Sequence, residues 1–264
     1  LDGWSLPILM QELFAHYELK IHGKAPISQM LDKAELSNSS AQTNLIPVRD
    51  NYERYINYLQ QTDKSVEAEF WTNYLSGFYS STPLPLVNTQ TPHETISDIN
   101  KQSLTLNATL TQNLKQLAQS HHLTLNTIMQ ACWGLLLHRY CGDDDVVFGI
   151  TLSGRPAELS GVEQMVGLFI NTLPLRLDFE QGNEGSLLQF LENLQQQQVK
   201  LRQHQTTPIT EVQSYSSVPN KQPLFQTILV FENYPLGAAL ATTDLAFSID
   251  GIDTHDQTNF PMTI

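Results

Sequence analysis

A continuous apolar run constrains the fold of this chain more than any other feature. It reads VVFGIT from Val146 to Thr151, and its length and β-branched residues predict a strand buried on both faces. The sequence Ser153-Gly154-Arg155-Pro156 ends the run, because glycine permits a positive φ and proline fixes φ. A second apolar segment follows from Val166 to Leu177. The sequence therefore predicts two buried strands joined by a segment that carries a cation at its start.

Two polar residues, Asn171 and Thr172, lie in the middle of the second apolar segment. Burying a polar group without a hydrogen-bond partner costs about 1–3 kcal/mol, so each side chain needs a partner. Both could be satisfied inside a packed pair of strands, or both could form the wall of a binding site. Physical chemistry alone leaves both interpretations open.

Composition excludes several classes of function. The 264 residues are 41% hydrophobic and 16% charged, which fits a soluble globular protein with a sizeable core. The 27 acidic residues outnumber the 14 basic ones, which argues against a nucleic-acid partner. No apolar run reaches the ~18–20 residues of a membrane helix and no signal peptide is present, so we expect no membrane contact and a cytoplasmic location. Cys132 and Cys141 have no ligand or redox spacing and are expected to be reduced.

Periodicity and capping residues predict the remaining elements. Helices are expected from Ser5 to about Tyr17, over Tyr52–Leu59 and Val66–Leu75, from Thr111, from Thr124 to Gly142, and from Ser186 with a buried face that includes Leu187. Strands are expected at Gln102–Asn107, Phe225–Glu232 and Leu245–Asp253, and a linker at Ala34–Pro47. Gln195 to Gln198 is expected mostly on the wet side of its helix.

Two clusters look like sites but have simpler explanations. His121-His122 falls at a predicted helix C-terminus, where the helix dipole favours a cation, and it is interpreted as a solvated cap. Three consecutive carboxylates, Asp143 to Asp145, cannot all face one ion in an extended chain, and they are interpreted as a solvated turn. We therefore predict no metal site.

The long run SGRPAELSGVEQMVGLFINTLPLR resembles, nearly residue for residue, the condensation domains of nonribosomal peptide synthetases. Their motif V-G-x-F-x-N-T is matched by Val166, Gly167, Phe169, Asn171 and Thr172. Weaker matches are His204 to Pro208, similar to H-Q-x-x-P, and Tyr52 to Tyr55, similar to Y-x-D-Y but with Glu53 and Arg54 in its middle. No catalytic role follows from the Y-x-D-Y match.

The first residues of the chain resemble the end of the family motif HHxxxDG, commonly followed by W-S. Asp2 and Gly3 match its last two residues, so the second histidine would lie three residues before Leu1. In the family, that histidine is held to act as general base or to position the amine, and the aspartate is thought to pair with an arginine. The resemblance thus implies that Asp2 and Gly3 end the catalytic motif, that Arg155 pairs with Asp2, and that Ser153 and Asn171 line the substrate tunnel.

The resemblance also implies a fold and a domain division. The expected fold is α/β, with the two lobes of chloramphenicol acetyltransferase, and incomplete at both ends. Residues 1–45 would be the remainder of the N-terminal lobe and residues 46–264 a C-terminal lobe that stops before its end. The piece alone is expected to be inactive.

The expected activity is amide bond formation between two carrier-protein-bound aminoacyl or peptidyl thioesters. The domain itself would bind no cofactor, since its substrates arrive on the phosphopantetheine of upstream and downstream peptidyl carrier proteins, beside an adenylation domain. An epimerisation or heterocyclisation domain of the same fold, or a non-catalytic docking scaffold, are the alternatives.

Overall fold

The computed structural model describes residues 1–22, 52–84, 100–180, 185–219, 222–232 and 258–264. These residues form two units, each built from three stretches of chain. The first unit comprises Leu1–Thr62, Ser153–Ile170 and Glu232–Gln257, and the second comprises Asp63–Leu152, Asn171–Phe231 and Thr258–Ile264. The lobe boundary predicted at residues 45 and 46 lies outside the described residues and stays a prediction.

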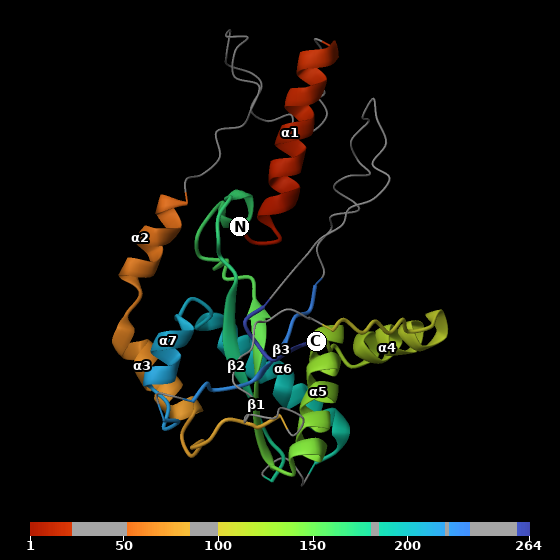
Figure 1. Ribbon diagram of the computed structural model, residues 1–264, viewed down its shortest axis with the longest axis vertical. Helices are drawn as coiled ribbons and strands as arrows, with labels where there is room; N and C mark the ends of the chain where they lie inside the picture. The colour runs from red at the N-terminus through yellow and green to blue at the C-terminus, as the bar shows by residue number, and fades with distance from the viewer. Residues whose placement is uncertain (23–51, 85–99, 181–184, 220–221, 233–257) are drawn as a thin grey trace. The chain divides into compact units, whose positions relative to one another are not determined.

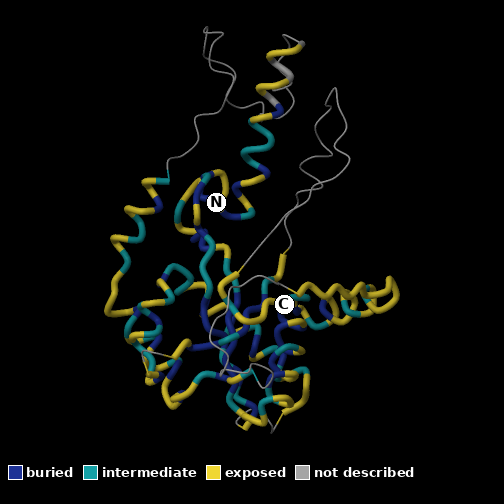
Figure 2. Tube along the Cα trace, viewed as in Figure 1, coloured by how far each residue is buried: buried dark blue, intermediate teal, exposed yellow. Residues whose placement is uncertain are grey.

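The second unit contains a four-stranded sheet in the order β2-β1-β3-β4 (Figure 1). Strand β1 (Asp145–Leu152) pairs antiparallel with β2 (Asn171–Asp178), so that Gly149 lies opposite Pro174. Strands β3 (Thr227–Leu229) and β4 (Met262–Thr263) continue the sheet in parallel pairing. Residues 146–150 of β1 are all buried (Figure 2), so both faces of the strand are covered, as the apolar run predicts.

Helices α3 (Lys64–Tyr74), α4 (Ala108–Ser120), α5 (Leu125–Cys141), α6 (Leu187–Gln203) and α7 (Ile209–Ser214) complete the second unit. Helix α5 packs against β1 and α6, and α7 packs against β2. The main hydrophobic core forms between these elements, with Trp71, Phe148 and Leu173 fully buried. The local signals at α5 are confirmed: Thr124 caps its first turn, and Gly142 ends it with a positive φ of 76°.

The first unit contains α1 (Ser5–His22), α2 (Glu53–Gln61) and a short 3₁₀ helix, η2 (Val162–Gln164). A small core lies between α2 and the segment around η2, and consists of Tyr55, Val162, Met165 and Phe169. Helix α1 runs five residues beyond the predicted end at Tyr17, because no helix breaker occurs before Gly23.

Several predicted boundaries are wrong. Gln102–Asn107 forms no strand, since no strand among the described residues pairs with it and Leu104 is 89% exposed. Helix α4 is capped by Asn107 rather than Thr111, because the Asn107 side chain accepts the Leu110 N–H at 2.8 Å. Strand β3 is shorter than the predicted Phe225–Glu232. The predictions for Ala34–Pro47 and Leu245–Asp253 fall outside the described residues.

Helix α6 also differs from its predicted apolar face. Ser186 caps the helix as expected, but Leu187 is 66% exposed, because the first residue of the helix precedes the turn that packs on the core. Gln198, predicted on the wet side, is buried and donates to the side chain of Gln130 at 2.8 Å. Periodicity places a residue on a face but does not reveal that a buried amide has found a partner on α5.

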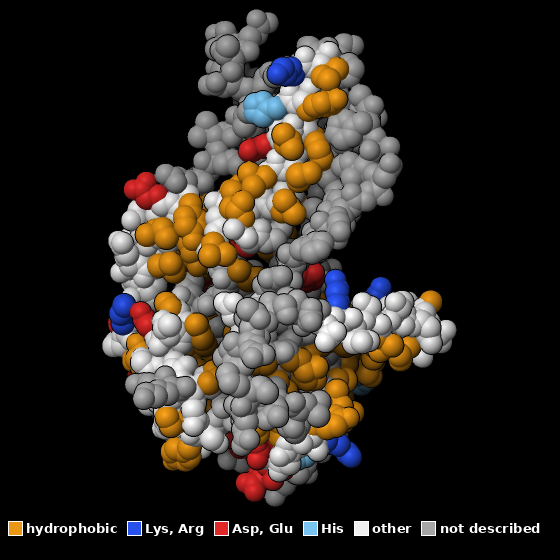
Figure 3. All heavy atoms as spheres, in the orientation of Figure 1, with side chains coloured by type: hydrophobic (Ala, Val, Ile, Leu, Met, Phe, Trp, Pro, Cys, Tyr) orange, Lys and Arg blue, Asp and Glu red, His pale blue; other side chains and the backbone are white. Residues whose placement is uncertain are grey.

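Figure 3 shows apolar side chains on the visible face of α1. The exposed apolar residues of this helix include Leu6, Leu13 and Ile21. Phe14, which follows Leu13 on this helix, is buried. No helix among the described residues combines the length and the apolar composition that a membrane span requires.

Candidate functional site

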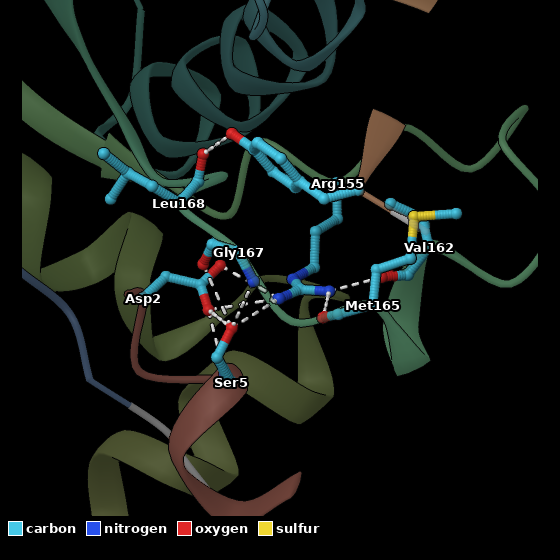
Figure 4. A network of polar contacts seen from close by, with 8 residues as sticks. Asp2, Ser5, Arg155, Val162, Met165, Gly167 and Leu168 are labelled. Atoms are coloured by element: carbon cyan, nitrogen blue, oxygen red, sulfur yellow. Dashed lines mark hydrogen bonds and ion pairs between the residues drawn. The ribbon is translucent and has the colours of Figure 1, made fainter. Parts of the chain in front are cut away.

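A buried ion pair joins Asp2 and Arg155 in the first unit (Figure 4). Arg155 Nη2 lies 3.1 Å and 3.0 Å from the two carboxylate oxygens of Asp2. The side chains are only 2% and 5% exposed, and at that depth either charge alone would be strongly disfavoured. The pairing expected from the resemblance is therefore present.

The remaining contacts of Arg155 hold the segment that follows it. Nη1 donates to the carbonyls of Val162 and, at 3.0 Å, Met165. The guanidinium carbon lies 3.9 Å from the centre of the Phe169 ring, within the range of a cation–π contact. Nε is buried and has no hydrogen-bond partner among the described residues. One side chain thus binds the start, the middle and the end of the segment from 162 to 169.

Ser5 connects Asp2 to the V-G-x-F-x-N-T motif. Its hydroxyl lies 2.7 Å from Asp2 Oδ1 and accepts hydrogen bonds from Gly167 N–H at 3.0 Å and from Arg155 Nη2 at 3.3 Å. The Asp2 N–H donates to the Gly167 carbonyl at 3.1 Å. The prediction of Ser5 as the cap of α1 is wrong, because Asp2 Oδ1 accepts the Ser5 N–H at 2.9 Å. The family's W-S continuation is the signal from which this role could have been found.

Gly154 allows the chain to turn between β1 and Arg155. Its φ is +64°, and a Cβ there would lie 1.6 Å from the carbonyl oxygen of Phe169. No residue with a side chain can therefore replace it without moving the backbone. Ser153, which precedes it, is exposed, and its predicted place in the substrate tunnel stays a prediction.

Asn171 is the first residue of β2 in the second unit, and both polar atoms of its side chain form hydrogen bonds. The amide nitrogen donates to the carbonyls of Gln205 at 2.9 Å and Thr207 at 2.7 Å, and Oδ1 accepts the Thr172 N–H at 2.9 Å. Asn171, a polar residue within the second apolar segment, therefore links β2 to the residues before α7. Its predicted contact with substrate stays a prediction.

The segment that accepts the hydrogen bonds of the Asn171 amide is itself bound to α3. His204 Nδ1 lies 3.0 Å from both carboxylate oxygens of Glu67, and the Thr207 hydroxyl donates to the same carboxylate. The Phe70 ring stacks on the His204 ring at 3.7 Å. The weak match to H-Q-x-x-P thus includes a buried polar cluster, but no sequence pattern singles out Glu67.

The acidic run before β1 ends in an ion pair. Asp145 accepts from Arg176 Nε at 2.9 Å and from Nη2 at 2.8 Å, whereas Asp143 and Asp144 are exposed. Burial raises the pKa of the Tyr74 phenol, which accepts the Arg176 N–H at 2.9 Å. Within the described residues, no group of three or more His, Cys, Asp or Glu side chains could hold a metal ion.

Comparisons with known proteins place these contacts in context. The family model of the condensation domain matches residues 1–264. One of the linear gramicidin synthase proteins of Brevibacillus parabrevis is 42% identical over 265 residues, which cover all of this chain and 5% of that protein. The X-domain from teicoplanin biosynthesis superposes with a TM-score of 0.64 at 23% identity, over 86% of this chain and 48% of that one. A four-domain nonribosomal peptide synthetase gives 0.62 at 19% identity, over 88% and 16%. These structures confirm the predicted fold class.

Proposed function

This chain belongs to the condensation domain family, and on that premise we propose that it forms amide bonds between two carrier-bound thioesters in nonribosomal peptide synthesis. The amine of the acceptor attacks the thioester carbonyl of the donor, so that a C–N bond forms and the C–S bond breaks. The departing thiolate takes up the proton that the amine loses. Holding both reactants in place can lower the barrier by about 7–11 kcal/mol, and a base can add about 10²–10⁴-fold.

The observation that carries the proposal is the buried contact of Asp2 with Arg155. Asp2 belongs to the end of the HHxxxDG motif, in which the family has its histidine. The ion pair fixes Asp2 beside Gly167 of the V-G-x-F-x-N-T motif. Separating two charges buried to this extent would leave each without its partner, so arrangements of the loop that part Asp2 from Arg155 are disfavoured. Such a fixed loop suits a reaction that depends on orientation. The 264 residues contain no histidine in that motif, so we expect no amide formation by them alone.

The substrates are proposed to arrive on the phosphopantetheine arms of upstream and downstream peptidyl carrier proteins, within a cytoplasmic synthetase that also holds an adenylation domain. The domain is proposed to bind no cofactor of its own. The relatives are far longer than this chain, which spans 5% of the linear gramicidin synthase protein that it resembles at 42% identity. Carrier and adenylation domains therefore have room in proteins of that kind.

The test uses the complete synthetase that contains these residues, with donor and acceptor loaded on their carrier domains. We expect a linear amide on the acceptor carrier, detected by mass spectrometry, and its loss in Asp2→Asn. A product lighter by one water would indicate heterocyclisation, and an inverted donor stereocentre would indicate epimerisation. Loaded carriers that never react would favour a docking scaffold and overturn the proposal.

A further inference from the structure

Tyr52 reaches the Asp2 network from a third stretch of chain. Its hydroxyl donates to the Leu168 carbonyl at 2.6 Å. Its ring meets the Phe169 ring edge-on, with the centres 5.0 Å apart. Because Phe169 lies under the guanidinium of Arg155, Tyr52 contacts both the backbone and the aromatic ring that support the ion pair. The sequence predicts neither contact, since there Tyr52 belongs to a predicted helix and to an imperfect Y-x-D-Y match.

Gly167 explains how closely Tyr52 approaches. A Cβ at Gly167 would lie 2.2 Å from Cδ2 and 2.4 Å from Cε2 of the Tyr52 ring, so the ring occupies the space that a side chain would need. The backbone of the same glycine bonds to Asp2 and Ser5. The loop of Asp2 and Ser5 (the catalytic-motif loop) therefore binds the peptide groups of Gly167, and the Tyr52 ring packs on its α-carbon.

Three backbone carbonyls between residues 165 and 168 accept hydrogen bonds from three different residues. Arg155 donates to the carbonyl of Met165, Asp2 to that of Gly167, and Tyr52 to that of Leu168. Among the described residues, Tyr52 is the donor to this stretch of backbone that belongs neither to Arg155 nor to the loop of Asp2 and Ser5. Tyr52 is thus an independent anchor for the surface against which Asp2 rests.

We propose that Tyr52 is a positioning residue for amide formation. By fixing Gly167 and Leu168, Tyr52 sets the position of Asp2 and hence of the catalytic-motif loop. The inference rests on the proposed function and assigns a role in it to the Y-x-D-Y segment. Burial, and then the charge of Asp2, raise the pKa of the Tyr52 phenol. The hydroxyl therefore stays protonated near neutral pH and remains a hydrogen-bond donor.

The experiment measures kcat and the KM for the loaded acceptor carrier in the complete synthetase, for Tyr52→Phe, Gly167→Ala, Tyr52→Ala and the double variant of the last two. Removing one hydrogen bond should lower kcat of Tyr52→Phe about three- to tenfold, with KM within about twofold of the unsubstituted protein. Gly167→Ala should be more strongly impaired, because its Cβ would collide with the Tyr52 ring. Adding Tyr52→Ala should restore part of that loss, since the obstacle is then removed.

Tyr140→Phe is the matched control, because this phenol is 70% exposed on α5 and its loss should leave kcat unchanged. All rates are taken per folded protein, from the amplitude of thermal unfolding. An unsubstituted synthetase that makes no amide would overturn the proposed function. If it is active, a Tyr52→Phe variant with full kcat, a change in KM alone, or a double variant no better than Gly167→Ala would overturn the inference by itself.

Discussion

At the scale of single residues, one buried cation connects the first residues of the chain to the segment from 162 to 169. Arg155 bonds to a carboxylate and to two carbonyls, and it lies over an aromatic ring. Guanidinium suits this place because its planar fork can donate in several fixed directions while its face stacks. Lysine has the same charge but none of that geometry.

Replacing Arg155 with alanine should strand the Asp2 carboxylate in a buried site. Breaking a buried pair by removing one partner costs about 3–5 kcal/mol, so the free energy of unfolding should fall by that amount. Arg155→Lys should recover less than half of the loss. Urea unfolding measures both, and Arg202→Ala, at an exposed position on α6, is the control. Equal stability of the lysine variant and the unsubstituted protein would contradict the geometric argument.

Tyr55 should make stability depend on alkaline pH. Burial, followed by the charge of Tyr52, raises the pKa of Tyr55 to about 12, whereas the unfolded phenol titrates near 10. Between these values the unfolded state binds fewer protons than the folded state, so the free energy of unfolding is unaffected below pH 10 and falls as the pH rises towards 12. Tyr55→Phe should lessen this fall. Tyr79→Phe, which removes an exposed phenol, is the control, and it should lessen the fall in the free energy of unfolding less than Tyr55→Phe does.

At the scale of elements, local chemistry predicts starts and stops well where a single capping residue is available. Thr124, Gly142 and Ser186 act as their residue types suggest. Helix α4, like α1, is an exception, because both Asn107 and Thr111 are acceptable caps and the sequence does not rank them. In the structure the Thr111 hydroxyl donates to the Asn107 carbonyl, so Thr111 lies within the first helical turn.

Asn107→Ala should therefore destabilise α4. Loss of an N-cap side chain costs about 1 kcal/mol, and thermal or urea unfolding should show a decrease of that size. Asn113→Ala is the matched control, since Asn113 is exposed in the middle of the same helix and alanine is the better helix former. If both variants lost equal stability, the cap at Asn107 would not be the cause.

At the scale of the whole molecule, the sequence predicts the core better than it predicts the site. The apolar run of β1 identifies the centre of the main core, because burial on both faces demands continuous apolar residues. Contacts between distant residues leave no local pattern, and Asp2 with Arg155 could be expected only through a family resemblance. The roles of Tyr52 and Glu67 escape prediction for that reason. The false strand at Gln102–Asn107 shows the converse, since alternation alone does not provide a pairing partner.

Two leucine-to-alanine substitutions test where that core lies. Leu173 is fully buried in β2, and its truncation should cost about 2–5 kcal/mol and lower the unfolding midpoint by about 5–15 °C. Leu187→Ala makes the same change at a residue that is 66% exposed, and it should shift the midpoint far less. Calorimetry compares them directly, and similar shifts would show that the assignment of the core is wrong.

The separation of Asp2 from its partners also matters during synthesis. Arg155 follows Asp2 by 153 residues, and Gly167 follows Ser5 by 162. At about 5–20 residues per second, a ribosome needs roughly 8–30 s to make that intervening chain. Throughout this interval Asp2 lacks its native partner Arg155, so the residues around Asp2 and Ser5 cannot complete their folded arrangement. Chaperone binding to the nascent protein should therefore be strongest before Arg155 leaves the exit tunnel.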